Sequence, residues 1–394
     1  MKSLLISALL VLTLSCNASF ACTTFCLKSK NQVLFGRNYD YDIGDGLIFI
    51  NKRGVVKTST AGDFPDPAKW VSHYGSVTFN QYGRENPTGG MNEAGLVVEE
   101  LGLNETEYPQ DKDLPSIDTQ EWIQYELDTS ATVEEAIANA RKVRIDSDVK
   151  VHFLISDKSG HATAIEFLHG ALVARTGKEL AVQALTNDTY AKSIAYLGVA
   201  PAEKVTGSGS LERFYRAARR TQTFEREKRD EPGAVQYAFD ILGNVAQDLG
   251  GTQWSIVYDQ LRRKIYFRTK QNRQIRMIDT TRFEFSCGSE VNVLDANSKD
   301  SGDVTDKFVS YTRKANRDLI ERSFNGTDFL KRIPVSIRDS FAAYPEAFPC
   351  QKKSSGSGNG GSQDSLKAPT LGRQDAGDLG LELGVTSESE NNPG

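Results

Sequence analysis

The chain begins with a largely apolar run that predicts an export signal. Lys2 comes before residues 4–12, which are almost all apolar, and Ser19 and Ala21 place small side chains at the two positions that a signal peptidase reads. We therefore expect residues 1–21 to be removed, so that the mature chain begins at Cys22.

Two other interpretations of this start stay open. In one, the cut falls elsewhere and Cys22 is an ordinary buried thiol. In the other, Cys16 or Cys22 carries a lipid anchor. A lipid-anchoring signal needs a bulky aliphatic residue three positions before its cysteine, where Cys22 has Ser19 and Cys16 has Thr13. The anchor is therefore disfavoured.

Short β-rich segments with Gly and Asn between them follow, up to about residue 106. This pattern is typical of strands joined by tight turns. Residues 22–27 and 32–41 form the first predicted hairpin. Further strands are expected over residues 46–51, 54–60, 75–79 and 95–101.

The spacing of apolar residues then changes from that of strands to that of helices, and this change recurs further along the chain. Helices are predicted over residues 119–127, 132–143, 211–228 (capped by Ser210) and 232–247 (beginning at Pro232). Strands are predicted over residues 151–156, 162–167, 253–259 and 264–268. Strands and helices in this alternating order favour an α+β fold with two sheets packed face to face and helices outside.

The C-terminal part has a weaker pattern. Residues 288–350 predict one helix, over 306–324, and we include them in one domain over 22–350. Residues 351–394 are rich in Gly, Ser, Asp and Glu. Such a segment buries too little apolar surface to offset its ordering entropy, so we expect a disordered tail.

Composition and charge exclude several functional classes. Charged residues make up 25% of the 394 residues, and the net charge is −5. No strongly basic stretch indicates nucleic acid binding, and no second run of 18 or more apolar residues indicates a membrane span. We expect an exported, soluble protein, periplasmic or secreted, that acts on a small molecule; a homo-oligomer is compatible with the sequence.

The five cysteines also fit an exported protein. Cys16 leaves with the signal, and Cys26, Cys287 and Cys350 remain besides Cys22. These three thiols cannot all pair; one disulfide is possible, and Cys287–Cys350 is the pairing we favour. The four histidines are scattered and no CxxC or HExxH pattern occurs, so we expect neither a metal nor another cofactor.

A cysteine at the start of the mature chain has a particular chemistry. It carries a thiol nucleophile and, on the same residue, an α-amine that titrates near pH 8 and can act as the base. The first hairpin can bring Arg37 and Asp40 back beside Cys22. An arginine favours the thiolate, and a carboxylate can hold the amine. Read without Cys22, Arg37 and Asp40 would be an ion pair on the surface of a sheet.

Five short motifs occur in order along the chain: Cys22-Thr23, Gly36-Arg37-Asn38-Tyr39-Asp40, Gly90-Met91-Asn92-Glu93-Ala94-Gly95-Leu96, Ala184-Leu185-Thr186-Asn187 and Ser210-Leu211-Glu212-Arg213-Phe214. Together they resemble the choloylglycine hydrolase family of linear amide C–N hydrolases, which includes bile salt hydrolases and penicillin V acylases. The likeness covers about residues 22–285.

The resemblance implies a four-layer αββα N-terminal nucleophile hydrolase sandwich and a set of catalytic roles. Cys22 would be the nucleophile and its α-amine the base, with Arg37 and Asp40 organising both. Asn187 would donate a hydrogen bond to the oxyanion, a contribution of about 3–4 kcal/mol in other enzymes. Arg213 would support the site electrostatically. Read alone, Asn187 is a turn residue and Arg213 a solvated helix residue.

The chain departs from the family pattern in two places. The position at which bile salt hydrolases place Asn and penicillin acylases an aromatic residue is Gly102 here, where only the backbone N–H is left to serve the oxyanion or substrate. Asn187 and Arg213 are also only 26 residues apart, without the longer insert of Gram-positive members. In both its short Asn187–Arg213 spacing and its predicted export signal, the chain resembles the Gram-negative acylase branch of the family.

These features favour an exported amidase that cleaves an amide between an apolar acyl group and a small amine. A penicillin V acylase or acyl-homoserine lactone acylase type ranks above a bile salt hydrolase because of Gly102. A lipid amidase of the acid-ceramidase type, and a non-catalytic binding protein on the same fold, are the other candidates.

Overall fold

A computed structural model describes residues 21–60, 66–201, 205–224, 229–247 and 251–352. By its contacts the chain divides into a unit over Met1–Gln351 and a second unit over Lys352–Gly394. The predicted signal (1–21) lies outside the described residues except for Ala21. The predicted tail (351–394) lies outside them except for Gln351 and Lys352. Both assignments stay predictions, as does the domain boundary.

The first sheet has seven strands and contains the predicted N-terminal hairpin. Its neighbours pair antiparallel except the last two strands, which pair parallel. In spatial order its strands are β14 (Ala184–Leu185), β1 (Thr23–Ser29), β2 (Gln32–Asp40), β15 (Thr252–Asp259), β16 (Lys264–Thr269), β17 (Arg276–Asp279) and β19 (Gly302–Asp303).

The second sheet has nine antiparallel strands. In order they are β13 (Ala171–Thr176), β12 (Ala162–Leu168), β11 (Val151–Ser156), β8 (Val97–Gly102), β7 (Pro87–Asn92), β6 (Ser76–Asn80), β3 (Leu47–Asn51), β18 (Asn292–Asp295) and β20 (Val309–Ser310). Two small ribbons pair β4 (Val56–Thr58) with β5 (Lys69–Val71) and β9 (Ser116–Ile117) with β10 (Arg144–Ile145).

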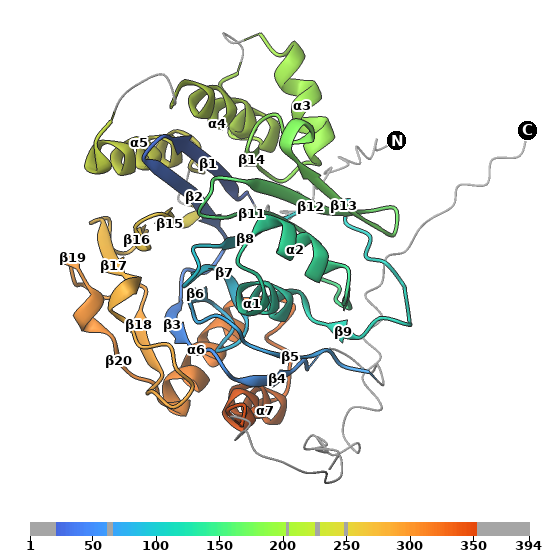
Figure 1. The fold of residues 1–394 in the computed structure, drawn as a ribbon, viewed down its shortest axis with the longest axis vertical. Coiled ribbons are helices and arrows are strands. Elements are labelled where there is room, and N and C mark those ends of the chain that lie inside the picture. The colour runs from blue at the N-terminus through green and yellow to red at the C-terminus, as the bar shows by residue number, and fades with distance from the viewer. Residues whose placement is uncertain (1–20, 61–65, 202–204, 225–228, 248–250, 353–394) are drawn as a thin grey trace, which may run out of the picture. The chain divides into compact units, whose positions relative to one another are not determined.

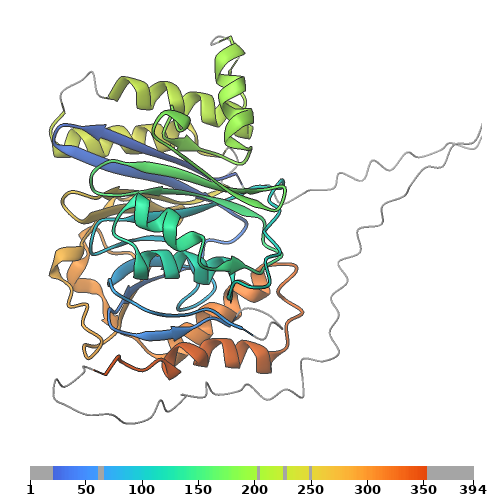
Figure 2. The same cartoon turned by 45° about the vertical axis from the view of Figure 1, so that its right-hand side comes forward.

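Helices cover the outer faces of both sheets (Figures 1 and 2). On the seven-stranded sheet, α4 (Ser210–Phe224) packs on β1, and α5 (Glu231–Asn244) packs on β2 and β15, while α3 (Tyr190–Val199) packs against α4. On the nine-stranded sheet, α1 (Thr119–Thr129) packs on β7 and β8, with α2 (Val133–Ala140) beside it. The α+β fold with four αββα layers is thereby confirmed.

The two sheets meet through a continuous apolar core. The ring of Phe79, from the nine-stranded sheet, stacks edge-on against Phe267 of the other sheet at 5.6 Å between ring centres. Gly36 in β2 has a specific role here, because a Cβ at this position would overlap the ring of Phe25 on the neighbouring strand. This packing explains a glycine inside a central strand.

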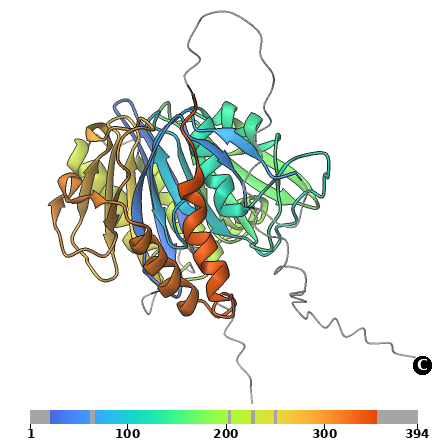
Figure 3. The ribbon, with the colours of Figure 1, turned by 90° about the horizontal axis from the view of Figure 1, so that it is seen from below.

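Most predicted elements occur within a few residues of their predicted ends, and the differences have local causes. Helix α6 (Arg313–Gly326) begins later than expected, because Thr312 caps it by accepting from the Ala315 N–H. Helices α3 and α7 (Val335–Ala343) were missed, as were strands β5, β7, β9, β10, β17, β18, β19 and β20. Figure 3 shows α6 and α7 lying side by side. No helix among the described residues is long and apolar enough to cross a membrane.

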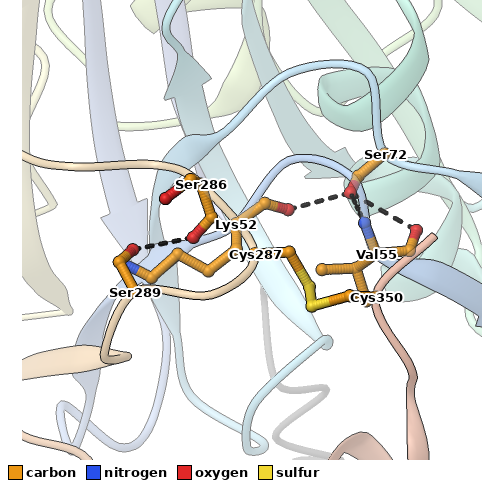
Figure 4. The surroundings of a disulfide bond; sticks show 7 residues. All are labelled: Lys52, Val55, Ser72, Ser286, Cys287, Ser289 and Cys350. Atoms are coloured by element: carbon orange, nitrogen blue, oxygen red, sulfur yellow. Dashed lines mark hydrogen bonds between the residues drawn. A yellow bond between two sulfur atoms is a disulfide. The ribbon is translucent and has the colours of Figure 1, made fainter. Parts of the chain in front are cut away.

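The favoured disulfide, Cys287–Cys350, is confirmed (Figure 4). It joins the end of the described chain to the loop after η4 (Thr280–Arg282), and the Cα atoms are 5.7 Å apart. The strand-like contacts beside it, from Val56 N to Pro349 O at 2.9 Å and from Gln351 N to Gly54 O at 2.7 Å, fix the same segment against β4. The remaining cysteines of the described part, Cys22 and Cys26, are buried free thiols.

Removing this disulfide should destabilise the fold without changing Cys22. Because the bond closes a loop of 63 residues, the double variant Cys287→Ala/Cys350→Ala should lose about 2–4 kcal/mol of unfolding free energy. Urea denaturation followed by tryptophan fluorescence measures this. As a control, adding a reductant should destabilise the wild type but not the variant. Equal stability of the wild type and the double variant without reductant would contradict a stabilising role of this disulfide.

Candidate active site

Three neighbouring strands bring the predicted residues together at one end of the seven-stranded sheet. Cys22 directly precedes β1, and Asp40 ends the antiparallel strand β2. On the other side of β1, the pair Thr24 and Leu185 places β14, and hence Asn187, at the same end. The Cys22 Sγ donates to the Asp40 carbonyl oxygen at 3.9 Å.

Arg213 connects the nucleophile to the oxyanion candidate. Its Nη1 donates to the Cys22 carbonyl oxygen at 2.6 Å and to the Thr23 hydroxyl at 2.7 Å, while Nη2 donates to Asn187 Oδ1 at 2.8 Å. The side chain is buried at the first turn of α4, where Nε donates to the Ser208 carbonyl at 3.1 Å. Arg213 is therefore part of the site and not a solvated helix residue.

These contacts fix the orientation of the Asn187 amide. Because Oδ1 accepts from Arg213, the amide nitrogen must face the other way, where it donates one hydrogen to the Gly102 carbonyl oxygen at 2.9 Å. The backbone N–H of Asn187 donates to the Ser210 hydroxyl at 2.9 Å. The amide carries a second hydrogen besides the one that it donates to Gly102.

Arg37 is fully buried between the two sheets and has a buried counter-ion. Its Nη1 pairs with the Glu99 carboxylate and donates to the Thr88 carbonyl at 2.9 Å. Burial alone would lower the pKa of Arg37, but Glu99 and Cys22 raise it above its ordinary value, so the guanidinium stays charged. Gly89 makes room for this pair, because a Cβ there would collide with the Glu99 carboxylate.

The Cys22 thiol is protonated in the described chain. Burial raises the pKa of the Cys22 thiol to about 11, although Arg37 acts in the opposite direction. Burial likewise raises the pKa of Asp40 to about 6, an effect that Thr252 and Arg213 only moderate. Neither carboxylate oxygen of Asp40 has a well-aligned donor among the described residues. A cation beside Asp40 and Cys22 would lower both pKa values.

Gly102 also lies at the site, as the last residue of β8. The contact found there uses its carbonyl oxygen, which accepts from Asn187, while the expected role of its backbone N–H stays a prediction.

Three residues near the site, Glu99, Tyr258 and His152, were not predicted from the sequence. Tyr258 donates to Glu99 behind Arg37, and His152 bonds to the carbonyl oxygen of Thr186, next to Asn187.

One group of residues in the described part has ligand atoms close enough to hold a metal: Glu134, Asp157 and His161. The Asp157 carboxylate accepts from the Val133 N–H at 3.1 Å and from the Ser159 N–H at 2.8 Å. These bonds cap α2 and close the β11–β12 turn, so a structural role accounts for Asp157.

Comparison with known proteins gives the same assignment as the motifs. Residues 22–198 match the family described as linear amide C–N hydrolases, choloylglycine hydrolase family. A penicillin V acylase of Pectobacterium atrosepticum is 26% identical over 329 residues, covering 71% of this chain and 86% of the relative.

Solved structures agree. A penicillin V acylase from Agrobacterium tumefaciens superposes with a TM-score of 0.66 and 28% identity, covering 74% of this chain and 98% of that one. A variant of conjugated bile acid hydrolase from Clostridium perfringens shares the fold, with a TM-score of 0.59 and 20% identity over 70% of this chain and 97% of that one. The chain is a hydrolase of linear amide C–N bonds, and its residues 22–198 belong to the choloylglycine hydrolase family.

Proposed function

We propose that this protein is an exported amidase whose nucleophile is the thiol of Cys22 at the start of the mature chain. The observation that carries the proposal is the convergence of Cys22, Asp40, Asn187 and Arg213 through the contacts described above. The family match also begins at residue 22. Export, to the periplasm or the medium, is supported by the signal pattern of residues 1–21.

In the described chain the Cys22 nitrogen is an amide, bonded to Ala21, and cannot accept a proton. Cleavage after Ala21 would convert it to an amine beside the buried Asp40 carboxylate. An ammonium group there would supply the missing donor to Asp40 and lower the pKa of the neighbouring thiol. Removal of the first 21 residues is thus part of the catalytic mechanism that we propose.

The reaction then proceeds in two steps. The Cys22 Sγ attacks the amide carbonyl carbon, and the thiol proton passes to the α-amine; the resulting oxyanion accepts a hydrogen bond from the Asn187 side chain. The C–N bond breaks as the α-ammonium returns the proton to the leaving amine, which leaves a thioester on Cys22. Water, deprotonated by the α-amine, attacks the thioester and releases the carboxylic acid and the free thiol.

The substrate we propose is an amide of an apolar acyl group with a small amine, such as penicillin V or an acyl-homoserine lactone. This rests on the two penicillin V acylases among the relatives and on Gly102. The mature protein should hydrolyse at least one of these amides faster, by kcat/KM, than glycine- or taurine-conjugated bile acids, and Cys22→Ala should abolish turnover. Preference for bile acids would overturn the substrate assignment, and a fully active Cys22→Ala variant would overturn the mechanism.

Retaining Ala21 should inactivate the enzyme. Two versions cut from a cleavable fusion, one beginning at Cys22 and one at Ala21, differ only in whether the α-amine belongs to Cys22. Loss of the general base should lower kcat by about 10²–10⁴-fold. Thiol alkylation should follow a pKa of about 11 in the Ala21 version, and a lower pKa in the mature one. Equal turnover by the two versions would refute the role of the amine.

Replacing the oxyanion donor should slow catalysis but leave substrate binding largely intact. We expect Asn187→Ala to reduce kcat by about 10²–10³-fold with a small change in KM, because the hydrogen bond forms mainly in the transition state. Asn31→Ala is the matched control, since Asn31 is exposed at the turn between β1 and β2, at the end of this hairpin away from Cys22. An Asn187→Ala variant with unchanged kcat would exclude the assigned role.

A further inference from the structure

We infer that His152 and Glu166 form a positioning pair that holds the Asn187 segment in place for catalysis. The inference rests on the proposed role of Asn187. His152 lies in β11 and Glu166 in β12, adjacent strands of the nine-stranded sheet, and both are fully buried. Their partners lie on residues 186–190, the segment that joins β14 to α3.

His152 bonds to the residue just before Asn187. Its Nε2 lies 2.6 Å from the carbonyl oxygen of Thr186. A carbonyl oxygen only accepts, so Nε2 carries the hydrogen. The other ring nitrogen, Nδ1, faces Glu166 Oε1 at 3.7 Å, which is too long for a hydrogen bond but places the two side chains next to each other.

Glu166 holds the other end of the same segment. Its Oε1 accepts from the Tyr190 N–H at 2.8 Å, at the start of α3, and its Oε2 accepts from Arg175 at 3.2 Å. Burial raises the pKa of Glu166, but the nearby His152 ring and the bonds from the Tyr190 N–H and Arg175 bring it below its ordinary value. Glu166 is therefore an ionised anchor at neutral pH.

The segment needs this support because its own strand is very short. Strand β14 has two residues, which pair with β1 at Thr24–Leu185 and Phe25–Ala184, and one more bond joins the Cys26 N–H to the Gln183 carbonyl at 2.8 Å. His152 and Gly102 lie on neighbouring strands of the opposite sheet, where Gly102 is paired with Val151, the residue before His152. The His152 ring bonds to Thr186, and the Gly102 carbonyl oxygen accepts from the Asn187 side chain. The position of the oxyanion donor relative to Cys22 is thus fixed from both sheets.

Three variants of the mature enzyme test this. His152→Leu removes the donor, His152→Gln retains an amide N–H near the position of Nε2, and His161→Gln is the control. His161 lies on the same β11–β12 hairpin, but its side chain is 58% exposed and contacts Glu134. Each variant is measured for hydrogen–deuterium exchange over residues 180–192 and for kcat and KM, with kcat normalised to titrated Cys22 thiol.

We expect His152→Leu to speed exchange in this segment at least tenfold and to lower kcat by about 100-fold, with KM nearly unchanged. A displacement of about 1 Å at a reacting group can cost this much. His152→Gln should recover most of both properties, and His161→Gln should match the wild type.

Unchanged exchange in His152→Leu would overturn the inference whether or not the protein turns over any amide. Faster exchange with normal kcat would show that the pair only stabilises the fold, and would equally overturn it. If exchange is faster but the wild type hydrolyses no amide tested, the proposed function fails while the His152–Glu166 pair still positions the segment.

Discussion

The site depends above all on one buried guanidinium, that of Arg213. It binds the carbonyl of the nucleophile's own residue at 2.6 Å and the side chain of Asn187 at 2.8 Å. Burial lowers the pKa of Arg213, but Asp40 and Cys22 oppose this, and the group remains a cation. Since one rigid fork makes both contacts, the separation between nucleophile and oxyanion donor is set by the geometry of a single side chain.

The charges around Cys22 are compatible with the free α-amine that we propose for the mature chain. Arg37 is neutralised by Glu99 and so contributes less to thiolate formation than an unpaired arginine would. Asp40 is buried without a well-aligned donor in the described part of the chain. Both observations are explained if an α-ammonium completes the site after cleavage. The uncleaved chain would then be inactive because its thiol stays protonated.

The sequence predicted the parts of the site that lie close together along the chain or in named motifs. Cys22, Arg37 and Asp40 follow from one hairpin, and Asn187 and Arg213 from motifs of the resembling family. Glu99 and His152 carry no such signal, because their partners lie on another strand or sheet and only the tertiary fold brings them together. A buried glutamate in a β-rich run looks like any other strand residue until its cation is known.

The same limit applies to secondary structure. Helix α3 was missed because its cap, Thr189, follows Asn187 and Asp188, which together predict a turn. Helix α7 has little helical periodicity and keeps Val335 and Ile337 exposed. Longer and more periodic elements, such as α1, α4 and α5, were found because an amphipathic pattern is visible without knowledge of the partner.

Trapping the covalent intermediate tests the central claim most directly. The mature enzyme would be mixed with a slowly hydrolysed amide, quenched in acid during turnover and mapped by peptide mass spectrometry. Our account predicts one acyl group, bound as a thioester to an N-terminal peptide that begins with Cys22. An acyl group on another residue, or an active enzyme whose N-terminal peptide begins before Cys22, would contradict it.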